Sequence, residues 1–207
     1  MYPRILKRLC DILAATALVL LLLPLILLVW LAVRLMLGAP VFYVDIRAGK
    51  DGRPLRLVKF RTMTTALGGN GKLLPDAERL TGFGKFLRRT SLDELPQLVS
   101  VILGDMSMVG PRPLPLRYVD RYSPRQAERL KVLPGLTGWA QIHGRNAVDW
   151  PVRLELDARY VDMLGRWYAP FLDIYIVVCT ILQVTWQALT GHGIASPGSA
   201  TMHEFKP

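Results

Sequence analysis

Residues 12–33 read ILAATALVLLLLPLILLVWLAV, a run of 22 residues without a charged side chain. A transmembrane helix needs about 20 apolar residues, so the run is long enough to cross a bilayer. It is longer than the apolar region of a secretory signal peptide, which has about 7–15 residues. The Gly38-Ala39-Pro40 that follows is a poor cleavage site. We therefore expect the segment to be retained.

Pro24 lies near the middle of this run, where it removes a backbone hydrogen bond from a helix. Each half then provides only about 16 Å of helix, roughly half of the hydrocarbon thickness. Cations flank both ends, and the positive-inside rule draws both flanks to the cytoplasmic side. We predict a re-entrant helix hinged at Pro24, with one straight span as the alternative. The cations are Arg4, Lys7 and Arg8 before the run and Arg34, Arg47, Lys50, Arg53, Arg56, Lys59 and Arg61 after it.

The chain of 207 residues is 51% apolar and carries a formal net charge of +10. This apolar content excludes a disordered chain, and the charge favours an anionic lipid or a phosphorylated ligand as partner. A nucleic-acid partner is disfavoured because the cations flank apolar sequence without a pattern of stacking aromatic residues. Cys10 and Cys179 lie far apart in apolar surroundings, which is typical of a reducing compartment.

The rest of the sequence predicts a mostly helical α+β domain. Two strand-like runs, 41–47 and 55–61, flank Asp51-Gly52 and predict a β-hairpin. Its alternation places Phe42, Val44 and Ile46 with Val58 and Phe60 on one face and Lys59 on the other. Helices are expected near 92–103, around 117–131 and from Asp149 or Pro151 to about Leu164, with a polar loop at 64–80.

A second uncharged stretch, 174–191, resembles another membrane span. Thr180, Gln183 and Gln187 nevertheless follow one another at helical spacing and form a single polar stripe. This stripe favours a helix that lies in the membrane interface or packs on the domain.

Asp93 and Glu94 stand side by side in KFLRRTSLDELPQL (85–98), at the start of an expected helix. One interpretation is structural, a capping box formed by Ser91 and Glu94. The other is catalytic, because cations before the pair would keep the pKa of Asp93 low and offset the repulsion between a carboxylate nucleophile and a phosphate. These cations are Lys85, Arg88 and Arg89.

Arg112 lies between Pro111 and Pro113, which restrict the backbone around it. A guanidinium presented so rigidly suits bidentate binding of phosphate, although an ordinary Pro-rich turn is the alternative. Gly104 is expected to end the preceding helix. Residues 144–146, Gly-Arg-Asn, could bind an anion or a sugar or form only a turn.

Five motifs, in consistent order and spacing, resemble those of the bacterial sugar transferases, in particular the small monotopic phosphoglycosyl transferases. They are KRLCDILAA (7–15), KFRTM (59–63), RRTSLDELPQL (88–98), GDMSMVGPRPL (104–114) and LPGLTGWAQIHGRN (133–146). The resemblance implies a re-entrant membrane helix broken at Pro24 within residues 1–38. It also implies a small cytosolic catalytic domain over 39–207, with amphipathic helices at the membrane interface.

The resemblance implies a ping-pong transfer of a phosphosugar from a UDP-sugar to undecaprenyl phosphate, which initiates synthesis of a surface glycan or glycoprotein. Asp93 would be the nucleophile and would hold Mg²⁺, and Glu94 would be the second catalytic carboxylate. The positions that match substrate-binding residues of the family are Lys59, Arg88, Arg112, Arg145, Asn146 and Asp157.

The resemblance places the protein at the bacterial inner membrane with its catalytic domain on the cytoplasmic face, and it allows a homodimer. Lys7, Arg8 and Arg34 are expected to contact anionic headgroups. Leu23 precedes Pro24 where the family has Ser, so no hydroxyl is available at the bend. Two other functions stay open: a membrane-tethered nucleotide-sugar hydrolase or phosphatase that uses Asp93, and a non-catalytic lipid-binding protein.

Overall fold

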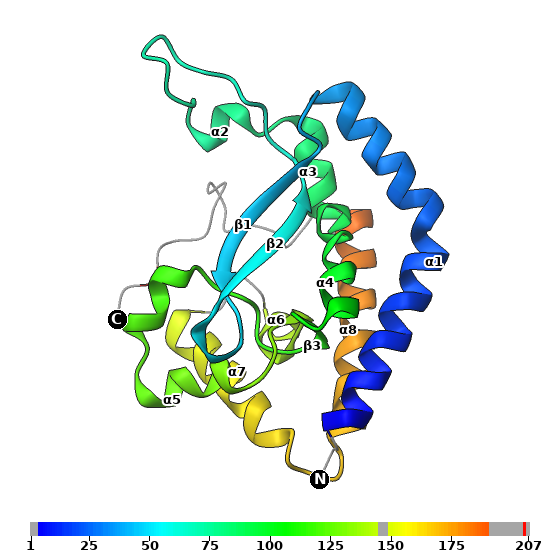
Figure 1. Ribbon diagram of the computed structural model, residues 1–207, viewed down its shortest axis with the longest axis vertical. Helices are drawn as coiled ribbons and strands as arrows, with labels where there is room; N and C mark the ends of the chain where they lie inside the picture. Colours follow the sequence, from blue (N-terminus) through cyan, green and yellow to red (C-terminus); the bar gives the residue numbers. More distant parts are fainter. Residues whose placement is uncertain (1–3, 145–148, 191–204, 206–207) are drawn as a thin grey trace.

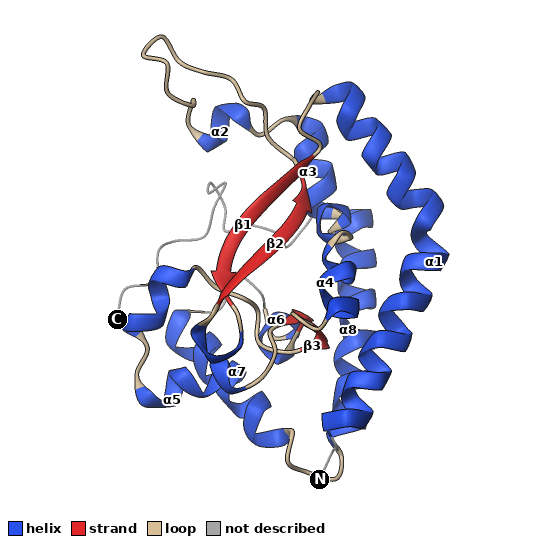
Figure 2. Cartoon of the chain, viewed as in Figure 1, coloured by secondary structure: helices blue, strands red, loops and turns tan. Residues whose placement is uncertain are grey.

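The computed structural model describes residues 4–144, 149–190 and 205. Helices dominate this part of the chain, with two small two-stranded sheets between them (Figure 2), which confirms the mostly helical α+β class. The helices are α1 Arg4–Met36, α2 Asp76–Arg79, α3 Gly82–Arg89, α4 Gln97–Leu103, α5 Pro124–Ala127, α6 Trp139–Ile142, α7 Trp150–Met163 and α8 Ala169–Thr190. The strands are β1 Phe42–Ala48, β2 Pro54–Phe60, β3 Ser107–Val109 and β4 Gly135–Thr137, and the 3₁₀ turns are η1 Lys50–Gly52, η2 Leu92–Glu94, η3 Leu116–Arg121 and η4 Glu128–Lys131.

The N-terminal helix α1 continues through Pro24 and changes direction partway along its length as it follows one side of the domain (Figure 1). The predicted break is therefore a bend inside one helix, because the proline removes one hydrogen bond and leaves the other turns intact. Ala15 before Pro24 and Val29 and Val33 after it are buried. Both halves of α1 thus pack against the protein.

Two arginines, the half-buried Arg8 and the buried Arg61, connect α1 to the domain near its two ends. Arg8 donates from its guanidinium to the carbonyl groups of Val101 and Ile102 at 2.6 and 2.8 Å, where α4 ends. Arg61, just after β2, donates to the carbonyl group of Gly38 at 2.8 Å and to that of Leu37. Val101 and Ile102 lie in the last turn of α4, and Leu37 and Gly38 follow α1. Carbonyl groups at the C-terminal end of a helix lack a full set of partners within it, and the arginines donate hydrogen bonds to them.

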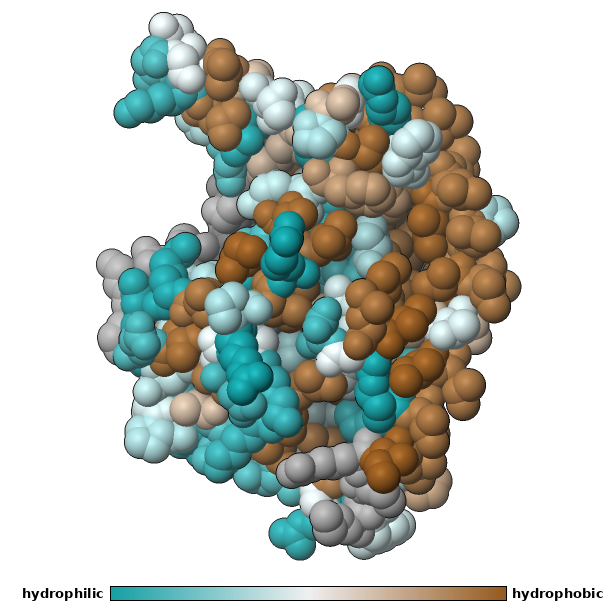
Figure 3. All heavy atoms as spheres, in the orientation of Figure 1, coloured by the Kyte–Doolittle hydropathy of each residue, from teal (hydrophilic) through white to brown (hydrophobic). Residues whose placement is uncertain are grey.

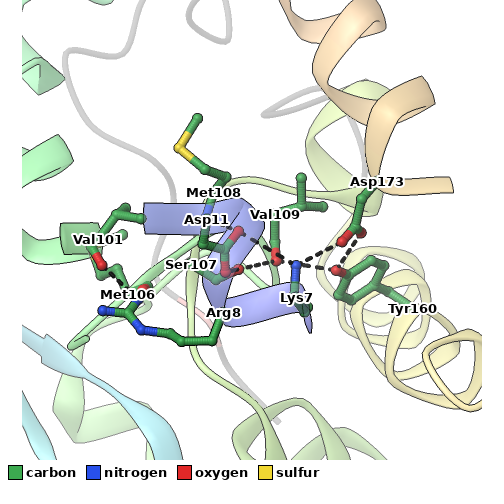
Figure 4. A network of polar contacts seen from close by, with 10 residues as sticks. All are labelled: Lys7, Arg8, Asp11, Val101, Met106, Ser107, Met108, Val109, Tyr160 and Asp173. Atoms are coloured by element: carbon green, nitrogen blue, oxygen red, sulfur yellow. Dashed lines mark hydrogen bonds and ion pairs between the residues drawn. The ribbon is translucent and has the colours of Figure 1, made fainter. Parts of the chain in front are cut away.

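Polar side chains join the first turns of α1 to α8 and β3 (Figure 4). Lys7 donates to Asp173 at 2.7 Å, and Asp11 accepts from the Ser107 hydroxyl at 2.7 Å. The expectation that Lys7 and Arg8 contact lipid headgroups is therefore wrong. Both cations are half-buried and bond to protein groups, because helix ends and buried carboxylates need partners.

Two helices of the described chain are long and apolar enough to cross a membrane, Ile5–Met36 within α1 and Ala169–Thr190, which is α8. Most of their large apolar side chains face outward, and Leu35 and Leu189 are 75% and 80% exposed. Figure 3 shows hydrophobic side chains along the edge that α1 forms. An apolar surface of this extent indicates association with a membrane.

The polar stripe of α8 faces the protein. Thr180 lies 2.5 Å from Thr137, hydroxyl to hydroxyl, and the Gln183 amide donates to the carbonyl group of Ile142 at 2.7 Å. Gln187 is buried. The prediction that this stripe packs α8 on the domain is confirmed.

The predicted hairpin forms, with Phe42 opposite Phe60 and Val44 opposite Val58. Asp51 and Gly52 both have positive φ in its turn, as expected for this pair of residues. Leu55 and Leu57 are buried on the other face of β2 and share that face with Lys59. The hairpin therefore directs Lys59 toward the interior of the domain.

The expected helix around 117–131 is wrong, because the chain there forms η3, α5 and η4 instead. Ser123 accepts a hydrogen bond from the backbone of Gln126 and begins a new helix, while Pro124 has no N–H to continue the previous one. The expected helix at 92–103 begins as η2 and continues as α4 after Pro96. It ends at Gly104, as predicted.

The glycine-containing segments that include Gly110 and Gly135 come together where β3 pairs with β4 in parallel. A Cβ atom on Gly135 would lie 2.1 Å from the backbone nitrogen of Gly110, and one on Gly138 would lie 2.1 Å from its carbonyl oxygen. Only glycine permits this approach. The contact fixes the backbone at Gly110, two residues before Arg112.

Candidate active site

The two adjacent carboxylates lie in η2, directly after Ser91, whose φ of 56° is in the left-handed region. The Ser91 side chain makes no capping hydrogen bond there. The capping-box interpretation is therefore wrong, and Asp93 and Glu94 are available for another role. A non-glycine residue held at positive φ is uncommon and often occurs at functional sites.

Glu94 binds two cations that come from distant parts of the sequence. Its Oε1 atom accepts from Lys59 Nζ at 2.7 Å and from an Arg112 guanidinium nitrogen at 2.8 Å. Burial by itself would raise the pKa of Glu94, but Arg112 and Lys59 outweigh burial and hold it well below its ordinary value. Glu94 is therefore a permanently ionised anchor between the hairpin and the turn at Arg112.

Asp93 has a different environment from its neighbour. It is only 8% exposed and makes no hydrogen bond or ion pair with the residues that the structure describes. Burial, and then the negative charge of Glu94, raises its pKa to about 6, and the cations around it offset only part of this effect. The expected low pKa of Asp93 is wrong because burial and the charge of Glu94 outweigh the surrounding cations.

A cavity of about 1720 Å³ opens in front of the two carboxylates. Lys59, Arg88, Arg112 and Arg153 are among the cations on its wall, and Arg88 donates from Nε to the Thr62 hydroxyl at 3.0 Å. The lining also includes Leu18 of α1 with Val177, Ile181 and Val184 of α8. The cavity therefore joins a strongly basic site to the apolar helices.

Asp157 lies behind the wall of this cavity. It is 1% exposed and accepts from the Nε and Nη2 atoms of Arg129 at 3.0 and 2.9 Å. Arg129 also donates to the backbone carbonyl group of Arg112. Asp157 thus supports the position of Arg112 through Arg129. The predicted residues Arg145 and Asn146 lie outside the described residues.

Sequence analysis missed Arg153, a buried arginine of α7 that lines the cavity. Its guanidinium lies 5.3 Å from the centre of the Trp150 ring. Burial and the nearby charge of Arg112 lower its pKa to about 10. Arg153 lies four residues before Asp157 and therefore on the same helix face, and this spacing is the sequence pattern that could have identified it.

The chain belongs to the bacterial sugar transferase family, whose profile matches residues 2–187. The protein is therefore a transferase. An uncharacterized sugar transferase, EpsL of Bacillus subtilis, is 46% identical over 201 residues, which cover 97% of this chain and 96% of that protein.

Other relatives carry names that state a reaction. The UDP-glucose:undecaprenyl-phosphate glucose-1-phosphate transferase of Escherichia coli is 41% identical over 87% of this chain. The chain spans only 40% of the length of that relative. The exopolysaccharide production protein ExoY of Rhizobium meliloti is 39% identical, over 86% of this chain and 84% of its own length.

Proposed function

We propose that the protein transfers a sugar 1-phosphate from a UDP-sugar to undecaprenyl phosphate and so initiates synthesis of a surface glycan or glycoprotein. The names of its relatives support these two substrates. The observation that carries the proposal is the contrast inside the carboxylate pair. Glu94 is bound by two cations, whereas Asp93 faces the basic cavity without a partner among the described residues.

In the first half-reaction an Asp93 oxygen attacks the β-phosphorus of the donor. A P–O bond forms to the carboxylate, the anhydride bond to the α-phosphate breaks, and UMP leaves with that electron pair. With a pKa of about 6, Asp93 is mostly ionised at neutral pH. It is also more basic than an ordinary aspartate, which suits a nucleophile.

In the second half-reaction an oxygen of undecaprenyl phosphate attacks the same phosphorus. The new P–O bond forms the polyprenyl diphosphate sugar, and cleavage of the acyl phosphate bond restores the Asp93 carboxylate. Attack by one anion on another requires nearby positive charge. That charge comes from Lys59, Arg88 and Arg112. Each lies close enough to Asp93 to oppose the rise of its pKa.

Glu94 acts in this scheme as a positioning residue. Its pKa is held too low for it to remove a proton effectively at neutral pH. Through one oxygen atom it fixes both Lys59 and Arg112, which belong to elements that meet only in the fold. We infer that Glu94 aims these two cations at the diphosphate of the donor.

The site can accommodate Mg²⁺ if the substrate provides most of the ligands. The described residues contain no group of three or more His, Cys, Asp or Glu side chains arranged to hold a metal. Mg²⁺ often binds one or two carboxylates together with substrate phosphates and water, and Asp93 offers such a carboxylate. The ion would neutralise diphosphate oxygens and stabilise the departing UMP.

We further propose that α1 enters and leaves the membrane on the cytoplasmic face of the inner membrane. The contacts of Arg8 and Arg61 support this arrangement, since they tie both end regions of α1 to one domain. Burial of Ala15 and Val33 on either side of Pro24 supports it as well. The apolar part of the cavity would then meet the acceptor lipid at the membrane surface.

The reaction is tested by measuring UMP release with and without undecaprenyl phosphate. We expect at most one UMP per enzyme without the lipid and many turnovers with it. Continued turnover without lipid would identify a nucleotide-sugar hydrolase instead. Unchanged transfer by Asp93→Asn, in a folded protein, would exclude Asp93 as the nucleophile.

A further inference from the structure

Phe205, close to the C-terminus, is buried to 2% exposure although it lies beyond the residues that match the family. Its ring packs among three aromatic side chains, with ring centres 5.6 Å from Tyr118, 6.0 Å from Tyr122 and 5.5 Å from Trp150. We call these four residues the aromatic box. Tyr118 and Trp150 also line the cavity in front of Asp93, so Phe205 packs against the back of the cavity wall.

The backbone of Phe205 is held as firmly as its ring. Its amide donates to the Tyr118 hydroxyl at 3.1 Å, and its carbonyl group accepts from Arg121 at 2.7 Å. Two hydrogen bonds and a buried ring specify one position for this residue. A residue that only happened to lie on the surface would not be expected to make all three contacts.

Two of the three aromatic partners of Phe205, Trp150 and Tyr122, contact a cation of the site or of its support. The Trp150 ring lies 5.3 Å from the guanidinium of Arg153, which faces the cavity. The Tyr122 hydroxyl accepts from Arg129 at 3.2 Å, and Arg129 holds the backbone of Arg112. Phe205 therefore lies behind two of the arginines that make the cavity basic.

The box lies on the side of the cavity away from the two membrane-associated helices (Figure 1). Tyr118 and Tyr122 come just before α5, which lies across the domain from α1 (Figure 1). The apolar part of the lining, Leu18 and Ile181, comes instead from the two membrane-associated helices. A lipid acceptor would approach from those helices, so a change in the box should alter the donor site first.

We propose that Phe205 is a positioning residue that fixes Arg153 and Arg112 through Trp150 and Tyr122 and thereby sets the affinity for the nucleotide diphosphate of the donor. The proposal rests on the proposed function, because it assigns the donor to this part of the cavity. It gives Phe205, which lies outside the matched residues 2–187, a role in substrate binding.

The test compares Phe205→Ala and Phe205→Leu with the wild type in the full chain. Removal of Lys206 and Pro207 alone is the matched control, since it shortens the chain but keeps the ring. We expect Phe205→Ala to raise the KM for UDP-sugar about tenfold with little change in kcat or in the KM for undecaprenyl phosphate. Phe205→Leu should show a smaller rise, and the control should show none.

Binding of UMP, measured by calorimetry, gives a second reading that does not depend on turnover. It should weaken by a similar factor in Phe205→Ala. A donor KM and UMP affinity within twofold of wild type in both variants would overturn the proposal, as would equal changes in both KM values. If the wild type itself transfers no sugar phosphate, it is the proposed function that fails.

Discussion

The Nζ atom of Lys7 lies 2.7 Å from Oδ2 of Asp173, so the first turn of α1 is joined to the first turn of α8 (Figure 4). The Tyr160 hydroxyl donates to the other oxygen of Asp173 at 2.8 Å and brings α7 into the same contact. Burial raises the pKa of Asp173, and Lys7 opposes that effect. Asp173 is thus one of the buried groups through which the two apolar helices are attached to the catalytic domain.

Replacement of Lys7 by Met should leave Asp173 buried without its cation. We expect a loss of about 2–3 kcal/mol in the free energy of unfolding, because a partly buried charge loses its partner. Lys131→Met is the control, since the Lys131 side chain is 65% exposed and, among the described residues, pairs only with Glu128 three positions earlier. Thermal unfolding in detergent measures both, and equal melting temperatures would show that the Lys7 contact contributes little.

Glu94→Gln should reduce kcat/KM by roughly 10- to 100-fold, because charge-assisted hydrogen bonds contribute about 1.5–3 kcal/mol. The amide keeps the shape of the side chain but no longer holds Lys59 and Arg112 by charge. The exposed carboxylate Glu155, which pairs with Arg125, supplies the control variant Glu155→Gln. Steady-state kinetics measures kcat/KM for both variants. Wild-type values for both would show that Glu94 does not contribute to the reaction.

Asp93→Asn should stabilise the folded protein at neutral pH. The pKa of Asp93 is raised to about 6 in the folded state, so its ionised form opposes folding above that pH, and this effect disappears as pH falls below the ordinary value. We expect a gain of about 2 kcal/mol at pH 7.5 that fades toward pH 4. Unfolding curves at both pH values test this, with Asp105→Asn at an exposed site as control. A loss of stability at pH 7.5 would contradict the assigned environment.

Gly135→Ala should destabilise the protein by about 3 kcal/mol or more, since its methyl group would collide with the backbone of Gly110. Gly69→Ala is the matched control, because a Cβ atom there has no neighbour within 4 Å and the backbone does not need a positive φ. Denaturant titration compares the two. Equal free energies of unfolding for the two variants would mean that the backbone near Gly110 and Gly135 can move apart without loss of stability.

Sequence patterns correctly predicted the elements that are determined by neighbouring residues in the sequence. The hairpin at Asp51-Gly52, the helix stop at Gly104 and the helix that starts at Trp150 all formed as expected. The single helix predicted for 117–131 is wrong because Ser123 and Pro124 start a new helix inside this stretch. That information was present in the sequence.

The electrostatics of the site could not be predicted from neighbouring residues. Arg88 and Arg89 precede Asp93 in the sequence. In the structure, however, the carboxylate pair is bound by Lys59 and Arg112, and both of these cations bond to Glu94. Burial then determines the pKa of Asp93. Such effects depend on which elements meet in the fold. Phe205 was missed for the same reason, because a single aromatic residue near a chain end carries no pattern.

The central claim is that Asp93 carries the sugar phosphate covalently during the reaction. Mass spectrometry of the protein after incubation with a panel of UDP-sugars, without acceptor lipid, tests it directly. We predict a phosphosugar adduct on the peptide that contains Asp93, its loss on addition of undecaprenyl phosphate, and no adduct in Asp93→Asn. Full transfer activity with no adduct on Asp93 at any stage of the reaction would contradict the account.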